Sequence, residues 1–420
     1  MSEQSPTLAR RLSTTDAVVV GLGAMLGAGV FSAFGPAAAV AGSGLLVGLG
    51  IAAVVAYCNA AASAQLAAVY PVSGGTYVYG RERLGPTWGF VAGWGFVIGK
   101  TASCAAMALT FGAYAVEGPE WAQRLLGLAA VLVLTAANYR GVGKTALLTR
   151  VLVVATLAVL GLVVVLALSG GSMSADHLDG WSSAGPYDVL QAAGLLFFAF
   201  AGYARIATLG EEVRDPSRAI PRAILVALAI VVVVYAAVGV SVLLASGPEA
   251  IADSTAPLAT AVDVAGAAWA EPVVRVGAAV ASLGALLVLI AGVGRTSLAM
   301  AREGDLPRVL DAVHPRFRVP HHAELAVAAV VGVLVLTVDL RGVIGFSSFG
   351  VLTYYAIANA SAYTQPAEQR RWSRGWNVLG LSGCAVLAVT LPPSAVAIGA
   401  GMLAVGLAGR RIVQRRRAQR

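Results

Sequence analysis

The sequence predicts an all-α integral membrane protein with about twelve transmembrane helices. Of its 420 residues 58% are hydrophobic and only 12% are charged, whereas about 25% are charged in ordinary soluble domains. The mean hydropathy is +0.80, so the chain has too little polar surface to face water on all sides. The 49 glycines fit this class, because small residues allow membrane helices to approach closely.

Apolar runs of about 20 residues, the length needed to cross a bilayer, recur along the whole chain. Charged residues, prolines and glycines divide these runs into twelve predicted spans: 16–40, 43–68, 87–116, 121–138, 146–169, 187–209, 222–246, 272–299, 323–339, 342–362, 376–391 and 394–411. Pro392 and Pro393 separate the last two spans, which are short. We expect no folded domain between the spans, so function should reside within the helices.

Basic residues gather at alternate ends of the predicted spans, as the positive-inside rule requires. With the N-terminus in the cytoplasm, 24 of the 29 lysines and arginines fall on the cytoplasmic side. Arg124, Arg275 and Arg341 lie near the outer ends, and Lys100 and Arg205 lie inside spans. We therefore expect a multi-pass protein of the cell membrane with both termini in the cytoplasm.

The net charge of +8 and the pI of about 9.7 do not indicate nucleic-acid binding, because the arginines form short clusters and no continuous basic face. We interpret the C-terminal arginines as an anchor to anionic lipid headgroups. Cys58, Cys104 and Cys384 lie in apolar runs without disulfide or metal-ligand spacing. We expect no cofactor, no metal, no cleavable signal peptide and no obligate protein partner.

Two spans carry residues that favour an interruption at mid-membrane depth. The first has four glycines within residues 21–29, and the sixth has an aromatic and glycine run at 197–203. An unwound helix exposes N–H groups on one half and carbonyls on the other, which suits a zwitterion or an ion. Close helix packing by small residues is the alternative explanation.

Interruptions five spans apart are typical of transporters built from inverted repeats. This spacing predicts a first five-helix repeat over 16–170, a second over 187–362 and two further helices over 376–411. Residues 1–15 and 412–420 would then form cytoplasmic tails, the second of them basic.

Five motifs make the chain resemble an amino acid permease of the amino acid–polyamine–organocation (APC) superfamily. They are GAGVF at 27–31, YPVSGGTY at 70–77, FAFAGY at 198–203, EEVRDPSRAIPR at 211–222 and AMAREGDLP at 299–307. The resemblance covers most of residues 15–360 and implies the five-plus-five inverted-repeat (LeuT-like) fold, with helices 1 and 6 discontinuous and two extra C-terminal helices. It implies a secondary transporter whose substrate is an amino acid or a related small amine.

The resemblance also implies where a substrate would bind. Its carboxylate would meet backbone N–H groups around Ala28 and Gly29, as expected at the N-terminus of a half-helix. Its amino group would meet carbonyls near Met25, Phe198 and Ala201. The neighbouring residues complete the predicted binding site: Gly27, Gly202 and Tyr203.

Gate residues are predicted on and after the sixth span. Phe200 and Tyr203 could line or gate the site, or belong to the packed core. Glu211 and Glu212 would lie at the cytoplasmic mouth, either in a charge network that closes it or in a solvated turn where Pro216 stops the helix. The stretch 70–77 would be a re-entrant or gating loop, with a plain turn as the alternative.

Lys100 is a candidate for coupling, because it lies near the centre of the third span and too deep for easy snorkelling. A buried lysine can lose its proton, so Lys100 would carry a coupling proton or balance an internal acid. A structural charge at a polar helix interface is the alternative.

Arg205 is a second candidate for coupling, and it bears on the substrate. Many relatives that take cationic substrates have an acid where Ala204 stands here, so a neutral or acidic amino acid fits better. A contact with Glu212 or snorkelling into the vestibule would also explain Arg205. In the eighth span, residues 281–285 have one hydroxyl, Ser282, whereas sodium-coupled proteins of related architecture have a pair there. Sodium coupling is therefore disfavoured, and proton symport and exchange remain open.

Other classes of function have less support. A membrane-embedded enzyme needs clustered acids, histidines or a nucleophile with its base at depth, and the four histidines all lie in predicted loops. The GVGKT run at 141–145 lacks the leading glycine of a phosphate-binding loop, which disfavours ATP-driven transport. A receptor or channel has no positive feature, and a polyamine or organic-cation permease of the same fold is the nearest alternative.

Overall fold

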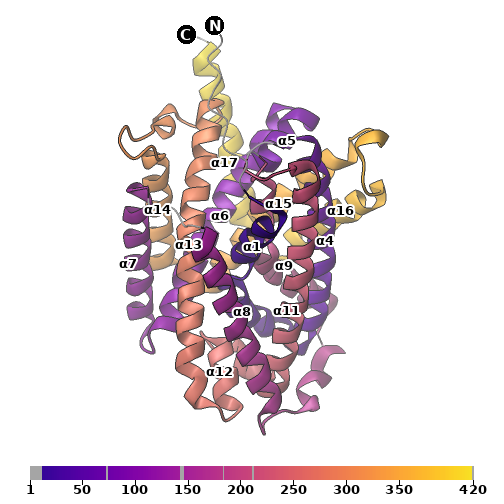
Figure 1. Cartoon of the computed structure of the whole chain (residues 1–420), viewed down its shortest axis with the longest axis vertical. Helices are drawn as coiled ribbons and strands as arrows, with labels where there is room; N and C mark the ends of the chain where they lie inside the picture. The colour runs from indigo at the N-terminus through magenta and orange to yellow at the C-terminus, as the bar shows by residue number, and fades with distance from the viewer. Residues whose placement is uncertain (1–11, 72–73, 142–145, 183, 211, 419–420) are drawn as a thin grey trace.

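The computed structural model describes residues 12–418 except for 72–73, 142–145, 183 and 211. Regular structure within these ranges is helical, and only an isolated parallel β-bridge between Leu12 and Val213 departs from it. Figure 1 shows the long helices running side by side along the long axis of the molecule. The predicted all-α membrane fold is confirmed.

The first half of the chain contains the helices of the first five predicted spans and a short helix, α5, between the second and third of them. Their bounds are α1 Thr14–Met25, α2 Ala28–Ser32, α3 Phe34–Ala41, η1 Gly42–Gly44, α4 Leu45–Val69, α5 Gly75–Leu84, α6 Pro86–Ala115, α7 Glu120–Tyr139, α8 Ala146–Ser169 and η2 Ala175–Ser182. Residues 75–77 begin a ten-residue helix, α5, and residues 72–73 lie outside the described residues, so a gating role for the stretch 70–77 remains a prediction.

The second half contains the helices of the remaining spans. Their bounds are α9 Pro186–Phe200, α10 Ala204–Ala207, α11 Pro216–Ala252, α12 Pro257–Val264, η3 Ala268–Ala270, α13 Glu271–Arg302, η4 Arg308–Asp311, α14 His321–Thr337, α15 Leu340–Tyr363, η5 Ala367–Gln369, α16 Arg374–Thr390 and α17 Pro393–Ala418. Each of the twelve predicted spans thus corresponds to helical structure.

Two boundaries differ from the prediction. Pro216 opens α11 at its first turn, where a proline loses no hydrogen bond, so the expectation that it stops the preceding helix was wrong. The final helix, α17, continues to Ala418, so most of the predicted basic tail at 412–420 is helical.

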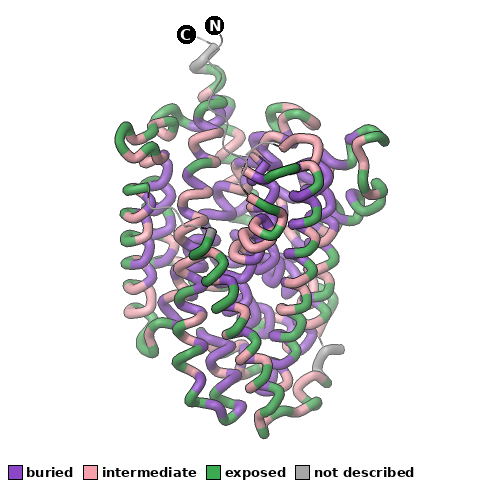
Figure 2. The backbone as a smooth tube through the Cα atoms, in the orientation of Figure 1, coloured by how far each residue is buried: buried purple, intermediate pink, exposed green. Residues whose placement is uncertain are grey.

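Nine helical stretches of the described residues are long and apolar enough to cross a membrane, and α9 and α14 are shorter apolar helices. Their outer faces carry large apolar side chains, such as Val233 at 68% and Val165 at 63% exposure. Figure 2 shows the buried residues concentrated inside the bundle and the exposed ones on its periphery. Apolar surface of this extent requires lipid as the surrounding solvent.

Helix α6 forms the centre of the bundle, and it packs most extensively against α15 and α13. Helix α5 and the end of α17 lie at one end of the molecule, while α12 lies at the other (Figure 1). That both termini lie in the cytoplasm, and that the chain divides into repeats at 16–170 and 187–362, remain predictions.

Candidate functional site

The first span is interrupted after Met25. Leu26 (φ −78°, ψ 35°) and Gly27 (φ −88°, ψ −144°) leave the helical conformation, and helix resumes at Ala28. From there α2 passes into α3 through Ala33, whose dihedral angles are helical. The first amides after the break have no carbonyl one turn earlier in their own helix, so they are available to other acceptors.

The sixth span is interrupted after Phe200. Residues 201–203 form turns before the four-residue helix α10, and turns follow at 208–210 and at 212 before α11 begins at Pro216. The Ala201 amide donates to the Phe198 carbonyl at 3.4 Å. The carbonyls that the broken helix exposes must therefore find partners outside it.

Two glycines bring the two interruptions into contact, and a third packs the first interruption against α13. A Cβ on Gly29 would lie 2.6 Å from Cα of Ala199, and a Cβ on Gly202 would lie 2.4 Å from the carbonyl oxygen of Ala24. A Cβ on Gly27 would lie 2.7 Å from Cβ of Ala285 on α13. The backbones are too close for any larger residue. We call the place where these interruptions meet, residues 25–29 and 198–203, the junction.

Tyr235 on α11 links the two halves of the junction. Its hydroxyl lies 2.6 Å from the Met25 carbonyl oxygen and 3.1 Å from that of Ala199. The Phe200 ring packs on the Tyr235 ring, with centroids 5.1 Å apart. The carbonyl of Met25, predicted to receive a substrate amine, is thus already hydrogen-bonded.

Lys100 reaches the junction from the middle of α6. Its ammonium donates to the Ala201 carbonyl at 2.9 Å, and the Tyr355 hydroxyl donates to the same oxygen at 3.4 Å. The lysine is only 8% exposed. No carboxylate of the described residues forms an ion pair with it, so a balancing internal acid is not seen in that part of the chain.

The aromatic residues of the sixth span are packed in the interior. Phe200 and Tyr203 are fully buried, and Phe198 is nearly so. Tyr203 stacks on Tyr355 with centroids 4.8 Å apart, so both candidate gates lie against tyrosines of other spans. A gate role for Phe200 or Tyr203 remains a prediction.

Arg205 lies on α10, beyond the junction, and its guanidinium donates to the Thr208 hydroxyl at 3.2 Å. The described ion pairs do not include one between Arg205 and Glu212. The backbone of Glu212 instead accepts from the Leu12 amide at 3.0 Å, and the Arg214 amide returns a bond to Leu12 at 2.9 Å. Glu211 lies outside the described residues.

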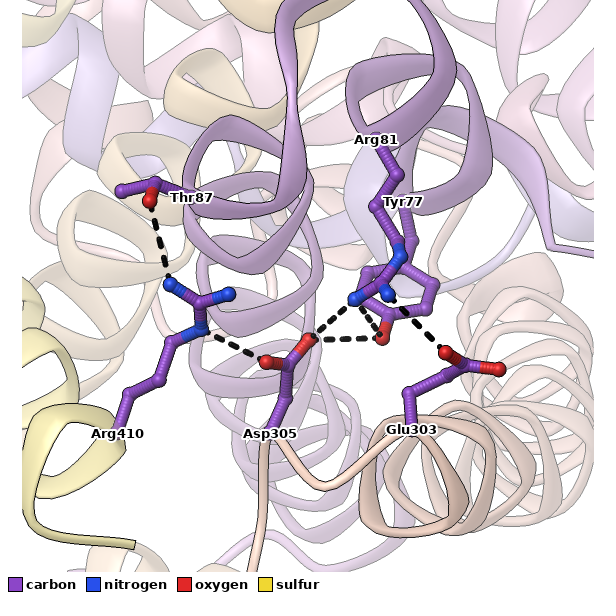
Figure 3. Close-up of polar contacts among 6 residues, drawn as sticks. All are labelled: Tyr77, Arg81, Thr87, Glu303, Asp305 and Arg410. Atoms are coloured by element: carbon purple, nitrogen blue, oxygen red, sulfur yellow. Dashed lines mark hydrogen bonds and ion pairs between the residues drawn. The ribbon is translucent and has the colours of Figure 1, made fainter. Parts of the chain in front are cut away.

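A charged cluster lies beside α5 (Figure 3). Asp305, in the loop after α13, accepts from the Tyr77 hydroxyl at 2.8 Å and from Arg81 at 3.0 Å. Arg81 also pairs with Glu303 at 3.0 Å. Burial and the Asp305 charge raise the pKa of Tyr77, which keeps its phenol a donor. The motifs at 70–77 and 299–307 thus meet in space.

The last helix joins the same cluster through Arg410. Its Nε lies 2.7 Å from the second Asp305 oxygen, and its Nη1 lies 3.2 Å from the Thr87 hydroxyl. The guanidinium also lies over the Phe90 ring, 5.4 Å from its centroid. The buried Asp305 carboxylate therefore connects α5 to α17, and Arg410 connects both to α6 (Figure 3).

At the opposite end of the bundle, a cavity of about 320 Å³ reaches α3. Its lining includes Gly35, Leu109, Arg124, Asp253 and Arg341. Gly35 lies on α3, the helix that follows α2 from the junction.

Comparison with known proteins gives the family. A family model described as "Amino acid permease" matches residues 12–406 of the chain. An uncharacterized transporter of Mycobacterium tuberculosis is 60% identical over 415 residues, covering 98% of this chain and 94% of the relative.

The chain belongs to the amino acid permease family of the APC superfamily. It is similar to the branched-chain amino acid permease of Bacillus subtilis (24% identity, 91% of this chain and 87% of the relative). It is also similar to human cationic amino acid transporter 4 (30% identity, 86% of this chain and 60% of the relative). The permease is thus a membrane transporter and not an enzyme, as the sequence predicted.

Several residues around the junction were not predicted. Tyr235 and Tyr355 bind its exposed carbonyls, and the Asn359 amide donates to the Asn59 side chain at 2.6 Å and to the Tyr355 carbonyl at 2.9 Å. The available signal was the presence of polar side chains in apolar runs, but which carbonyl each one meets depends on helix packing.

The Asp305 cluster generates a stability prediction. Asp305→Asn should lower the unfolding free energy by about 3 kcal/mol, because it leaves two arginines next to a neutral group in a largely buried site. Asp311→Asn is the matched control, because its pair with Arg302 is exposed and should contribute less than about 1 kcal/mol. Thermal unfolding in detergent measures both, and equal shifts for the two variants would contradict the assignment.

Proposed function

We propose that this permease is a secondary transporter that carries an amino acid across the cell membrane through the junction. The supporting observation is the direct contact of two interrupted helices, with Gly29 against Ala199 and Gly202 against Ala24. Interrupted helices at mid-depth offer free backbone N–H and C=O groups to a substrate, whereas the surrounding lipid tails offer no hydrogen-bonding groups.

In this proposal the substrate carboxylate binds the amides of Ala28 and Gly29, which begin a helix. The substrate amine binds carbonyls of Met25, Phe198 and Ala201. Two of these carbonyls already accept bonds from Tyr235 and Lys100, so the incoming amine must share or displace those donors. Binding of substrate is thereby linked to rearrangement of α6 and α11 against the junction.

We further propose that transport is proton symport and that Lys100 carries the proton. Lys100 is buried and touches the junction directly, so its charge can respond to substrate. The titratable side chains that face it are Cys104, one turn on, and Tyr355 of α15. Glu211, Glu212 and Arg205 would act nearer the cytoplasm, where the motif at 70–77 and α5 close the exit.

Gly29→Val should reduce uptake to background while the protein still reaches the membrane, because its Cβ would meet the Ala199 backbone. Gly50→Val is the matched control, since a Cβ there meets nothing within 4 Å. Uptake of labelled amino acids and surface expression should be measured together. Normal uptake by Gly29→Val would remove the junction as the binding site.

Purified protein in liposomes should accumulate a labelled amino acid when the outside is acidified, and a protonophore should abolish that accumulation. Lys100→Ala should lose this dependence on the pH gradient. Unchanged pH dependence in a well-expressed Lys100→Ala variant would contradict the proton role. Uptake that requires internal amino acid and ignores the gradient would identify an exchanger instead.

A further inference from the structure

Lys100 is a buried cation at the junction without a carboxylate partner among the described residues. Its hydrogen bond goes to a carbonyl, that of Ala201 at 2.9 Å. All acids within the described α-helices lie in a first or last turn. At the depth of Lys100, the described helices therefore supply only uncharged acceptors.

An unpaired charge in a low-dielectric interior is costly, and a single carbonyl dipole offsets only part of that cost. An anion that enters the junction would offset the remaining cost of burying the Lys100 charge. A cationic substrate would instead meet the Lys100 ammonium at close range, with repulsion unrelieved by a nearby acid.

Two of the carbonyls proposed to bind the substrate amine already have side-chain donors. The Tyr235 hydroxyl is on the Met25 carbonyl, and the Lys100 ammonium is on the Ala201 carbonyl. The Lys100 ammonium thus occupies the place beside the Ala201 carbonyl that a substrate ammonium group would take. The capacity that remains at the junction is for negative charge.

Arg205 adds to the positive charge on the same segment. It lies four residues after Ala201, is partly buried, and has the Thr208 hydroxyl as its hydrogen-bond partner. The described part of the junction and its immediate exit thus carry two cations. Neither forms an ion pair there, and Glu212 acts on Arg205 through a longer-range electrostatic interaction only.

We propose that the permease selects small carboxylates of net negative charge and that Lys100 is the counter-charge that selects them. The inference rests on the proposed function, because it takes the junction as the transport site. Acidic amino acids and 2-oxo acids are both small carboxylates of net negative charge. Competition experiments with a member of each class show which of the two the permease selects.

The test is competition in proteoliposomes, with labelled uptake measured against glutamate, 2-oxoglutarate, leucine and lysine. At least one of the two anions should compete about tenfold more strongly than leucine or lysine. Lys100→Gln should lose that preference, and Lys100→Arg should keep it. Thr110→Val is the control on the same helix, because its hydroxyl bonds only its own helix at the Ala106 carbonyl.

Binding in detergent, followed as a rise in unfolding temperature with each solute, gives a readout independent of transport. Preference for leucine or lysine in the wild type, or an anion preference unchanged in Lys100→Gln, would overturn this inference and leave the permease function intact. Binding and transport of none of the solutes, together with no uptake of any other amino acid, would remove the proposed function as well. Wild-type selectivity decides the matter even where Lys100→Gln does not fold.

Discussion

The structure depends on the close crossing of two membrane helices that are both broken where they meet. Backbone polar groups at mid-depth must be satisfied by the protein itself, because lipid offers no hydrogen bonds. Glycines at 29 and 202 let the backbones touch, and donors from three other helices then reach the exposed carbonyls: Tyr235, Lys100 and Tyr355. The surrounding bundle holds these donors in position.

The spans and both interruptions could be predicted from the sequence, because apolar length and clustered glycine are local signals. The partners of the broken backbone could not be predicted. Tyr235 and Met25 are 210 positions apart, so their contact depends on how α11 packs against α1. The extension of α17 to Ala418 was missed for a different reason, since a run of arginines can either continue a helix or leave it as a solvated tail.

The cations around Asp305 have a carboxylate partner, whereas the buried cation at the junction has none among the described residues. Near α5, Asp305 is bound by Arg81 and Arg410, so the cations there are matched by a carboxylate (Figure 3). At the junction, the hydrogen-bond partner of Lys100 among the described residues is a carbonyl. In the proposed mechanism an anion bound beside Lys100 raises the affinity of Lys100 for its proton. The protonated lysine raises the affinity for the anion by the same factor, because coupling between two ligands is reciprocal. Symport of proton and anion follows from this mutual stabilisation.

The central claim is that substrate binds where the two interrupted helices meet. An experimental structure of the permease with a transported solute bound tests it most directly. The account predicts density for the solute between residues 25–29 and 198–203, with its carboxylate toward the amides of Ala28 and Gly29. Solute density elsewhere in the bundle, or unbroken helices at Gly27 and Gly202, would contradict it.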